Sequence, residues 1–266
     1  MREPRFLFPF LLAASLLAFG CVPAGDDDDD DGGDDNGGSG GVAATGGQMA
    51  PAPTGGTPMM EDLTGLSANE ICSREIDLSN LNALPGGPEN ANPECQYDPA
   101  QKGVSVGKQI ENFVMRQWNE EPFWFHQNCG TTKAVWVFLS TGWCGACENY
   151  ASTVKAFHDL YKDRGLEVVW VVGEDPDRMP PTCDYMVNYF RNKGANFTII
   201  RDNSFDFTER YVDPTASNSL PKQYILDGQT MEMVFAGGGR SQESEDMIRM
   251  MVGAEEDIGM PAPSGR

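Results

Sequence analysis

Two runs of apolar residues, 134–139 and 166–172, are the clearest hydrophobic pattern in the sequence. Both are continuous and rich in Val, Leu and aromatic residues, which is typical of strands that are buried on both faces. Between them, residues 147–161 carry apolar side chains at helical spacing, and Gly165 follows as a stop signal. A strand, a helix and a strand of these lengths predict a right-handed βαβ unit with parallel strands.

Weaker patterns predict further elements on both sides of this unit. Residues 61–102 contain many prolines and glycines and are expected to form loops and short helices around a domain. The last strands are expected to form a hairpin with Asp227-Gly228 as its turn. The predicted strands are 112–115, 123–125, 197–200, 223–226 and 231–235, and the predicted helical segments are 184–192, 205–211 and 242–251.

Two cysteines, Cys144 and Cys147, stand where the first buried strand gives way to the helix. The free N–H groups and the positive dipole at a helix N-terminus stabilise an anion, so Cys144 is expected to be the attacking thiolate and Cys147 the resolving thiol. A zinc site would need two further ligands at short spacing, and His126 and His158 do not provide them. A static disulfide closing so small a loop would add little stability.

The first 20 residues have the pattern of a signal peptide, with two arginines before an uncharged run that is too short to span a bilayer. The end of this run, Leu17 to Cys21, resembles the lipobox of bacterial lipoproteins, which implies lipidation of Cys21. Residues 21–60, rich in Asp and Gly, are expected to form a disordered tether. We therefore expect a lipid-anchored protein of the bacterial cell envelope, facing the periplasm or exterior; plain secretion is the alternative.

The chain has a formal charge of −21. Nine acidic and two basic residues lie within positions 1–60, which leaves −14 for the remainder. A nucleic-acid partner is excluded because the chain lacks the basic surface that phosphate binding requires. The expected organisation is an N-terminal extension over 61–102, one α/β domain over 103–252 and a flexible tail over 253–266.

Three sequence features resemble the TlpA/ResA group of extracytoplasmic thiol–disulfide oxidoreductases, which have the thioredoxin fold. Residues 143–147 match the redox motif, with Trp143, Gly145 and Ala146 supporting the two cysteines. Leu220-Pro221 lies where the family has a cis-proline that faces the disulfide. Glu174 falls where ResA-like members carry a buried acid near the thiols. The resemblance implies a thioredoxin-like fold, a central mixed sheet flanked by helices, and places Pro221 and Glu174 in the catalytic site.

Physical arguments agree with these assignments. Cys144 and Glu174 both follow the carboxyl ends of parallel strands, where functional groups gather in α/β sheets. An acid in an apolar setting near two sulfurs is expected to have a raised pKa, which suits proton exchange with Cys147. Glu174 as an exposed loop acid and Pro221 as an ordinary trans turn proline are the alternatives. Trp143 is expected to shield the sulfurs.

Four further cysteines indicate two structural disulfides in an exported protein. We disfavour pairing of Cys129 with Cys183, because they would lie at opposite ends of the sheet. Either Cys72 pairs with Cys183 and Cys95 with Cys129, or Cys72 pairs with Cys129 and Cys95 with Cys183.

The predicted function is disulfide exchange in exported proteins through Cys144 and Cys147, with no cofactor and no metal. The resemblance implies apocytochrome c or other cysteine proteins as substrates and a membrane thiol donor as partner. One alternative is a peroxiredoxin-like peroxidase, for which Thr141 stands three residues before Cys144, although Val137 occupies the place of the motif's proline. The other is a copper-binding module, whose usual cysteine spacing is one residue longer.

Overall fold

The computed structural model describes residues 63, 65–76, 78–205 and 219–262. The predicted signal peptide, Cys21, the Asp-rich linker and most of the predicted helical turn at 205–211 lie outside these residues. None of the helices in the described part of the chain is long and apolar enough to cross a membrane.

The described strands form one mixed sheet in the order β2-β1-β5-β4-β3-β6-β7. At its centre β3, β4 and β5 are parallel, whereas β1, β6 and β7 join antiparallel on either side. The predicted parallel βαβ unit and the mixed sheet are confirmed. The strands are β1 (Val114–Gln117), β2 (Pro122–Trp124), β3 (Ala134–Ser140), β4 (Leu166–Val172), β5 (Thr198–Arg201), β6 (Lys222–Asp227) and β7 (Met233–Gly238).

The helices begin and end close to the predicted positions, because local caps fix them. Thr182 caps α3 by accepting from the backbone N–H of Tyr185, and Ser241 caps α5 by accepting from that of Ser244. The helices are α1 (Ala68–Cys72), α2 (Gly145–Tyr161), α3 (Cys183–Lys193) and α5 (Gln242–Met251), with short 3₁₀ turns at Leu81–Ala83, Pro99–Gln101, Lys162–Arg164, Asn203–Phe205 and Glu255–Asp257.

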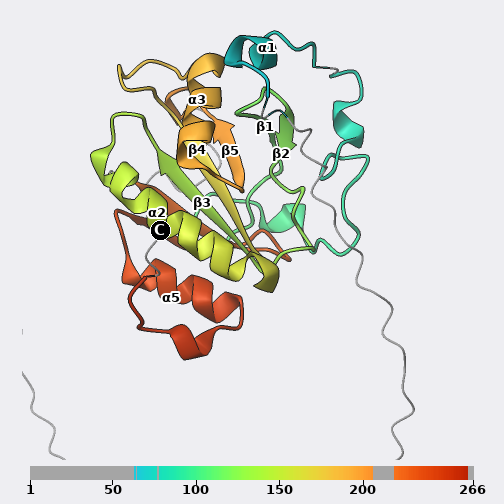
Figure 1. Ribbon diagram of the computed structural model, residues 1–266. Helices are drawn as coiled ribbons and strands as arrows, with labels where there is room; N and C mark the ends of the chain where they lie inside the picture. Colours follow the sequence, from blue (N-terminus) through green and yellow to red (C-terminus); the bar gives the residue numbers. More distant parts are fainter. Residues whose placement is uncertain (1–62, 64, 77, 206–218, 263–266) are drawn as a thin grey trace, which may run out of the picture. The chain divides into compact units, whose positions relative to one another are not determined.

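Each face of the sheet is covered by its own apolar core, which explains the continuous apolar run of β3. The helices α2, α3 and α5 pack on one face (Figure 1). Trp136 and Phe138 belong to the apolar cluster that contains side chains of these helices. Val135, Val137 and Leu139 point to the opposite face, where they belong to a cluster with Ile110, Phe113 and Phe125 from the segment before β3. Every residue of β3 is buried, so the strand is fixed in place directly before the cysteine motif.

The hairpin of β6 and β7 differs from the sequence prediction, which gave it a two-residue turn at Asp227-Gly228. Five residues, 228–232, connect β6 and β7. The carboxylate of Asp227 accepts hydrogen bonds from the backbone N–H groups of Gln229 and Thr230, and Met231 adopts a left-handed conformation with φ 59°. Because Asp227 satisfies these buried donors, the chain forms a longer loop that buries the side chain of Met231 completely.

The N-terminal extension is fastened to the domain by covalent and polar contacts. Disulfides join Cys72 to Cys183 and Cys95 to Cys129. Nε1 of Trp124 donates to the carbonyl oxygen of Leu81 at 2.8 Å, which adds a polar contact between the domain and the extension. The disulfides match one of the two pairings that the sequence left open and exclude the other.

Contacts of the domain continue beyond residue 252, where we expected a flexible tail. Ala254 is completely buried. The hydroxyl of Tyr161, at the end of α2, donates to the carboxylate of Asp257 at 2.9 Å. The described part of this segment is therefore packed against the domain, because an apolar side chain and a hydrogen bond hold it to α2 and α5.

Candidate active site

The centre of the site is a disulfide between Cys144 and Cys147 at the start of α2. Cys144 is the N-cap residue, and its Sγ accepts a hydrogen bond from the backbone N–H of Cys147 at 3.1 Å. Cys144 is 7% exposed and Cys147 only 1%. Cys144, at the helix N-terminus, is therefore the slightly more exposed of two buried cysteines. Its role as the attacking thiolate stays a prediction that rests on the helix N–H groups and dipole.

The two residues between the cysteines form the first turn of the helix. Gly145 and Ala146 are both exposed, and a side chain at Gly145 would meet no atom within 4 Å. The first turn of α2 is thus exposed between two buried cysteines.

The ends of β3 and β4 meet beside the disulfide because the two strands are parallel and in register. Ser140 pairs with Val172, and beyond the strands the N–H of Gly142 donates to the carbonyl oxygen of Glu174 at 2.8 Å. A Cβ at Gly142 would lie 2.7 Å from the backbone nitrogen of Pro176, so this close approach requires glycine. The loop after β4 is therefore held against the residues that precede Cys144.

Glu174 differs from the expected buried acid. Its side chain is half-buried, and its Oε2 accepts a hydrogen bond from Nε1 of Trp143 at 2.6 Å. The preceding Gly173 has no room for a side chain, because a Cβ there would lie 2.6 Å from the ring of Phe205. The hydrogen bond between Trp143 and Glu174 is a contact that the sequence did not indicate.

Trp143 is 39% exposed and is covered on one face by a cation. The guanidinium carbon of Arg178 lies 4.4 Å from the centre of its ring. Asp175 holds this loop in shape by accepting from the backbone N–H groups of Asp177 and Met179, and Arg178 has a φ of 63°. The expectation that Trp143 shields the sulfurs remains a prediction, since the described contacts of its indole are with Glu174 and Arg178.

Pro221 lies on the other side of the motif. The Leu220–Pro221 bond is cis, as the resemblance implied. Leu139 pairs with Lys222 in the antiparallel β3–β6 ladder, so the residues before Lys222 lie beside those that follow Leu139 and lead to Cys144. Pro221 is buried, and Leu220 packs against the apolar core that contains both redox cysteines.

Buried polar groups lie beneath the site, and sequence reasoning missed their role. The helical spacing after Cys147 predicts only a core position for Tyr150. In the structure its hydroxyl donates to Oε1 of the completely buried Glu245 at 2.8 Å. Burial, and secondly the charge of Glu245, raises the pKa of Tyr150. The position of Tyr150 three residues after Cys147 indicates that the two side chains share a face of the helix, and this was the sequence signal that could have pointed to the tyrosine. Nothing local in the sequence marked Glu245 as buried.

Two further groups near the motif complete the site. The hydroxyl of Thr141 is buried and has no hydrogen-bond partner among the described residues. Burial raises the pKa of Tyr185, which packs against Gly142, to about 12. Within the described residues, no group of three or more His, Cys, Asp or Glu side chains could hold a metal ion.

Comparison with known proteins agrees with this geometry. Residues 106–231 match the AhpC/TSA family. The AhpC/TSA match includes β1 to β6, both redox cysteines, Glu174 and Pro221. Together with the order of the strands, it shows that the fold is thioredoxin-like. No curated protein matches the sequence.

Solved structures with similar folds include three from different bacteria. An uncharacterised conserved protein from Geobacillus kaustophilus has a TM-score of 0.47 and 16% identity, and the alignment covers 61% of this chain and 88% of that one. The thioredoxin domain of a thiol-disulfide oxidoreductase from Bacteroides vulgatus has a TM-score of 0.44 and 11% identity, with 59% of this chain and 100% of that one covered. The peroxidoxin BcpB from Mycobacterium tuberculosis has a TM-score of 0.45 and 9% identity, with 57% of this chain and 98% of that one covered.

Proposed function

We propose that the protein is a thiol–disulfide oxidoreductase that exchanges disulfides in exported proteins. The observation that carries the proposal is the disulfide between Cys144 and Cys147, with Cys144 as the N-cap of α2. A static structural bridge would not need one of its cysteines at a helix N-terminus, where a thiolate is stabilised. The AhpC/TSA match and the position of Pro221 beside the motif support the same activity.

The reaction begins from the reduced pair. The Cys144 thiolate attacks one sulfur of a substrate disulfide, forms a mixed disulfide and releases the other substrate cysteine as a thiolate, which takes up a proton. Cys147 then loses its proton and attacks Cys144, which releases the second substrate thiolate. Two electrons pass to the substrate, and the enzyme is left with its disulfide. A dithiol donor must reduce it again, and with an oxidised donor the same steps run in reverse.

We further assign supporting roles around these steps. Glu174 is the candidate proton carrier, because its carboxylate follows the end of β4, next to the motif, and accepts a hydrogen bond from Trp143. Pro221 is the candidate residue for contact with a substrate strand, because it lies beside the residues that lead to Cys144. We further propose the TlpA/ResA-like subtype, with apocytochrome c or another exported cysteine protein as substrate and a membrane thiol donor as the source of electrons. Capture of such partners is the test.

Trapping of mixed disulfides tests the proposal directly. Cys147→Ser should capture substrate proteins covalently on Cys144 in the cell envelope, because the resolving thiol is missing. Cys144→Ser should trap few or none, and Cys95→Ser, in a structural disulfide, serves as the control for nonspecific thiol capture. If Cys147→Ser captures no protein and the wild type cannot exchange a model disulfide, the proposal fails.

A thiol peroxidase is the second candidate, supported by Thr141. Its buried hydroxyl lacks a described partner and stands three residues before Cys144, where it could donate to a bound peroxide. The Cys144 thiolate would attack one peroxide oxygen, forming a sulfenic acid and releasing water or an alcohol, and Cys147 would then condense with it and release a second water. Consumption of hydrogen peroxide that is lost in Thr141→Val, without capture of proteins by Cys147→Ser, would favour this candidate.

A further inference from the structure

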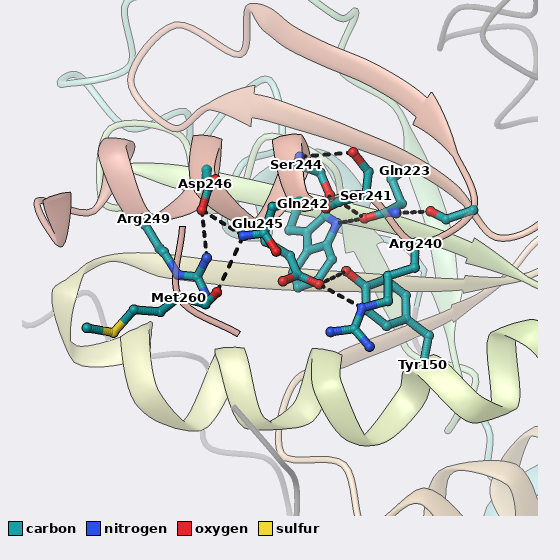
Figure 2. Close-up of polar contacts among 12 residues, drawn as sticks. Tyr150, Gln223, Arg240, Ser241, Gln242, Ser244, Glu245, Asp246, Arg249 and Met260 are labelled. Atoms are coloured by element: carbon teal, nitrogen blue, oxygen red, sulfur yellow. Dashed lines mark hydrogen bonds and ion pairs between the residues drawn. The ribbon is translucent and has the colours of Figure 1, made fainter. Parts of the chain in front are cut away.

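A buried carboxylate in α5 holds an exposed arginine next to the redox site. Glu245 is completely buried, and its Oε1 accepts hydrogen bonds from the hydroxyl of Tyr150 at 2.8 Å and from Nε of Arg240 at 3.2 Å (Figure 2). Its Oε2 has no partner among the described residues. Burying a carboxylate is costly unless a positive charge compensates it. The side chain of Arg240, however, is 58% exposed, and only its Nε bonds to Glu245 to compensate the buried charge.

The backbone on both sides of Arg240 is fixed. The N–H of Gly239 donates to the carbonyl oxygen of Pro221 at 2.7 Å, and the side-chain amide of the buried Gln223 donates to the carbonyl oxygen of Gly239. Ser241, the next residue, caps α5. Gly239 has a φ of 72°, a conformation suited to glycine. These bonds attach the loop carrying Arg240 to the cis-proline.

The guanidinium also lies over the helix that carries the cysteines. Its central carbon is 5.5 Å from the centre of the Tyr150 ring. Tyr150 follows Cys147 by three residues on the same buried face of α2. Arg240 therefore lies near both the cis-proline loop and α2, the helix that begins at the redox cysteines.

The remaining nitrogens of Arg240 are available for a ligand. No described residue accepts a hydrogen bond from its Nη1 or Nη2, and the residues from 61 onward carry a formal charge of −14, so this exposed cation belongs to a domain that is acidic as a whole. A planar guanidinium whose outer edge is open matches a carboxylate in bidentate geometry. The buried Glu245 restricts the side chain in advance, which lowers the entropy lost on binding.

We propose that Arg240 selects substrates by binding the carboxylate of an Asp or Glu next to the reactive cysteine of the substrate peptide. The proposal rests on the proposed function and adds to it the substrate class. Repulsion from the acidic remainder of the protein would otherwise disfavour such substrates, so one fixed cation at the entrance makes the site selective for them.

Matched peptides test this selection. Full-length protein, reduced beforehand, is mixed with disulfide peptides that differ only in Asp, Asn or Lys beside the cysteine, and with the uncharged bis(2-hydroxyethyl) disulfide. We expect the second-order rate constant for the Asp peptide to exceed that for the Asn peptide by about three- to tenfold. The Lys peptide should be slowest. In Arg240→Gln, the ratio of Asp to Asn should fall to about 1.

Arg164→Gln is a matched control, because it removes the same charge far from the redox cysteines. Arg164 is an exposed arginine paired with Glu256 beyond the far end of α2, and Arg164→Gln should leave the ratio unchanged. Should Arg240→Gln fail to fold, the wild type alone decides: its ratio should decline toward 1 between low and high salt, since salt screens exposed charges. A ratio near 1, or one unaffected by salt, overturns the proposal. Lack of turnover of every disulfide overturns the proposed function instead.

Discussion

At the scale of single residues, the hydrogen bond between Trp143 and Glu174 links the redox motif to the loop after β4. The indole nitrogen and the carboxylate oxygen are 2.6 Å apart, and the N–H of Gly142 bonds to the backbone of the same glutamate. Glu174 is thus attached at both its backbone and its side chain to the residues just before Cys144. A carboxylate held in this way can pass a proton without losing its orientation.

Replacement of Glu174 by Gln isolates this role. The amide oxygen can still accept from Trp143, whereas the carboxylate that we propose as the proton carrier is lost. We expect disulfide exchange to slow by about 10²-fold, at the lower end of general acid–base effects because the group is half-exposed, and the pH dependence of the rate to flatten. Stopped-flow measurement of single turnovers across pH checks this. Trp143→Phe, which keeps the carboxylate but removes its partner, is the control. An unchanged rate and pH profile for Glu174→Gln would make Glu174 an ordinary loop acid.

At the scale of elements, the disulfide between Cys72 and Cys183 joins α1 to the first residue of α3. The two helices are short and distant in sequence, since the cysteines have a sequence separation of 111 residues. The guanidinium of Arg191 in α3 also donates to the carbonyl oxygen of Leu63 at 3.4 Å. The disulfide therefore holds the N-terminal extension against α3, the helix that follows the loop in which Glu174 and Arg178 contact Trp143.

The two structural disulfides should differ in their contribution to stability. Chain entropy gives about 4.8 kcal/mol for the bridge spanning 111 residues and about 3.8 kcal/mol for the one spanning 34. The free energy of unfolding should therefore decrease by about 1 kcal/mol more in Cys72→Ala/Cys183→Ala than in Cys95→Ala/Cys129→Ala. Urea unfolding of the oxidised full-length protein measures both losses. The reverse order would show that native contacts, rather than the constraint on the unfolded chain, decide the difference.

At the scale of the whole molecule, the redox site lies entirely within the described residues from 134 onward, and the acidic residues 26–31 come well before it in sequence. The N-terminal pattern remains a prediction of a lipid anchor followed by a tether. A tether would let the domain reach partners that project from the same membrane, and a charged one would remain extended through self-repulsion.

Substitution of Cys21 tests the anchor. The wild type should incorporate labelled fatty acid and fractionate with membranes, because a thioether-linked lipid partitions into the bilayer. Cys21→Ala should lose the label and appear in the soluble fraction, while Cys129→Ala controls for loss of any other cysteine. Limited proteolysis between residues 25 and 60 should release the domain with its disulfide-exchange activity intact. A Cys21→Ala protein that is still labelled and membrane-bound would rule out this anchor.

The sequence by itself determined the central βαβ unit and the position of the redox pair. The apolar run 134–139 and the helical spacing after Cys147 are local patterns, so they specify a buried strand followed by a helix whatever the rest of the chain does. Cys144 therefore had to lie at a helix N-terminus. The cis-Pro221 was also anticipated, but through the resemblance to a family and not through any local pattern.

Only the tertiary structure decided which distant groups meet. Tyr150 and Glu245 are 95 residues apart in the sequence. A glutamate in the first turn of an amphipathic helix is expected to be exposed and to stabilise the helix dipole. Glu245 is buried because packing of α5 on α2 turns it toward Tyr150, and Arg240 becomes oriented only as its counter-charge. The choice between two disulfide pairings and the half-buried position of Glu174 depended likewise on how loops lie across the sheet. These outcomes are long-range, so no local periodicity encodes them.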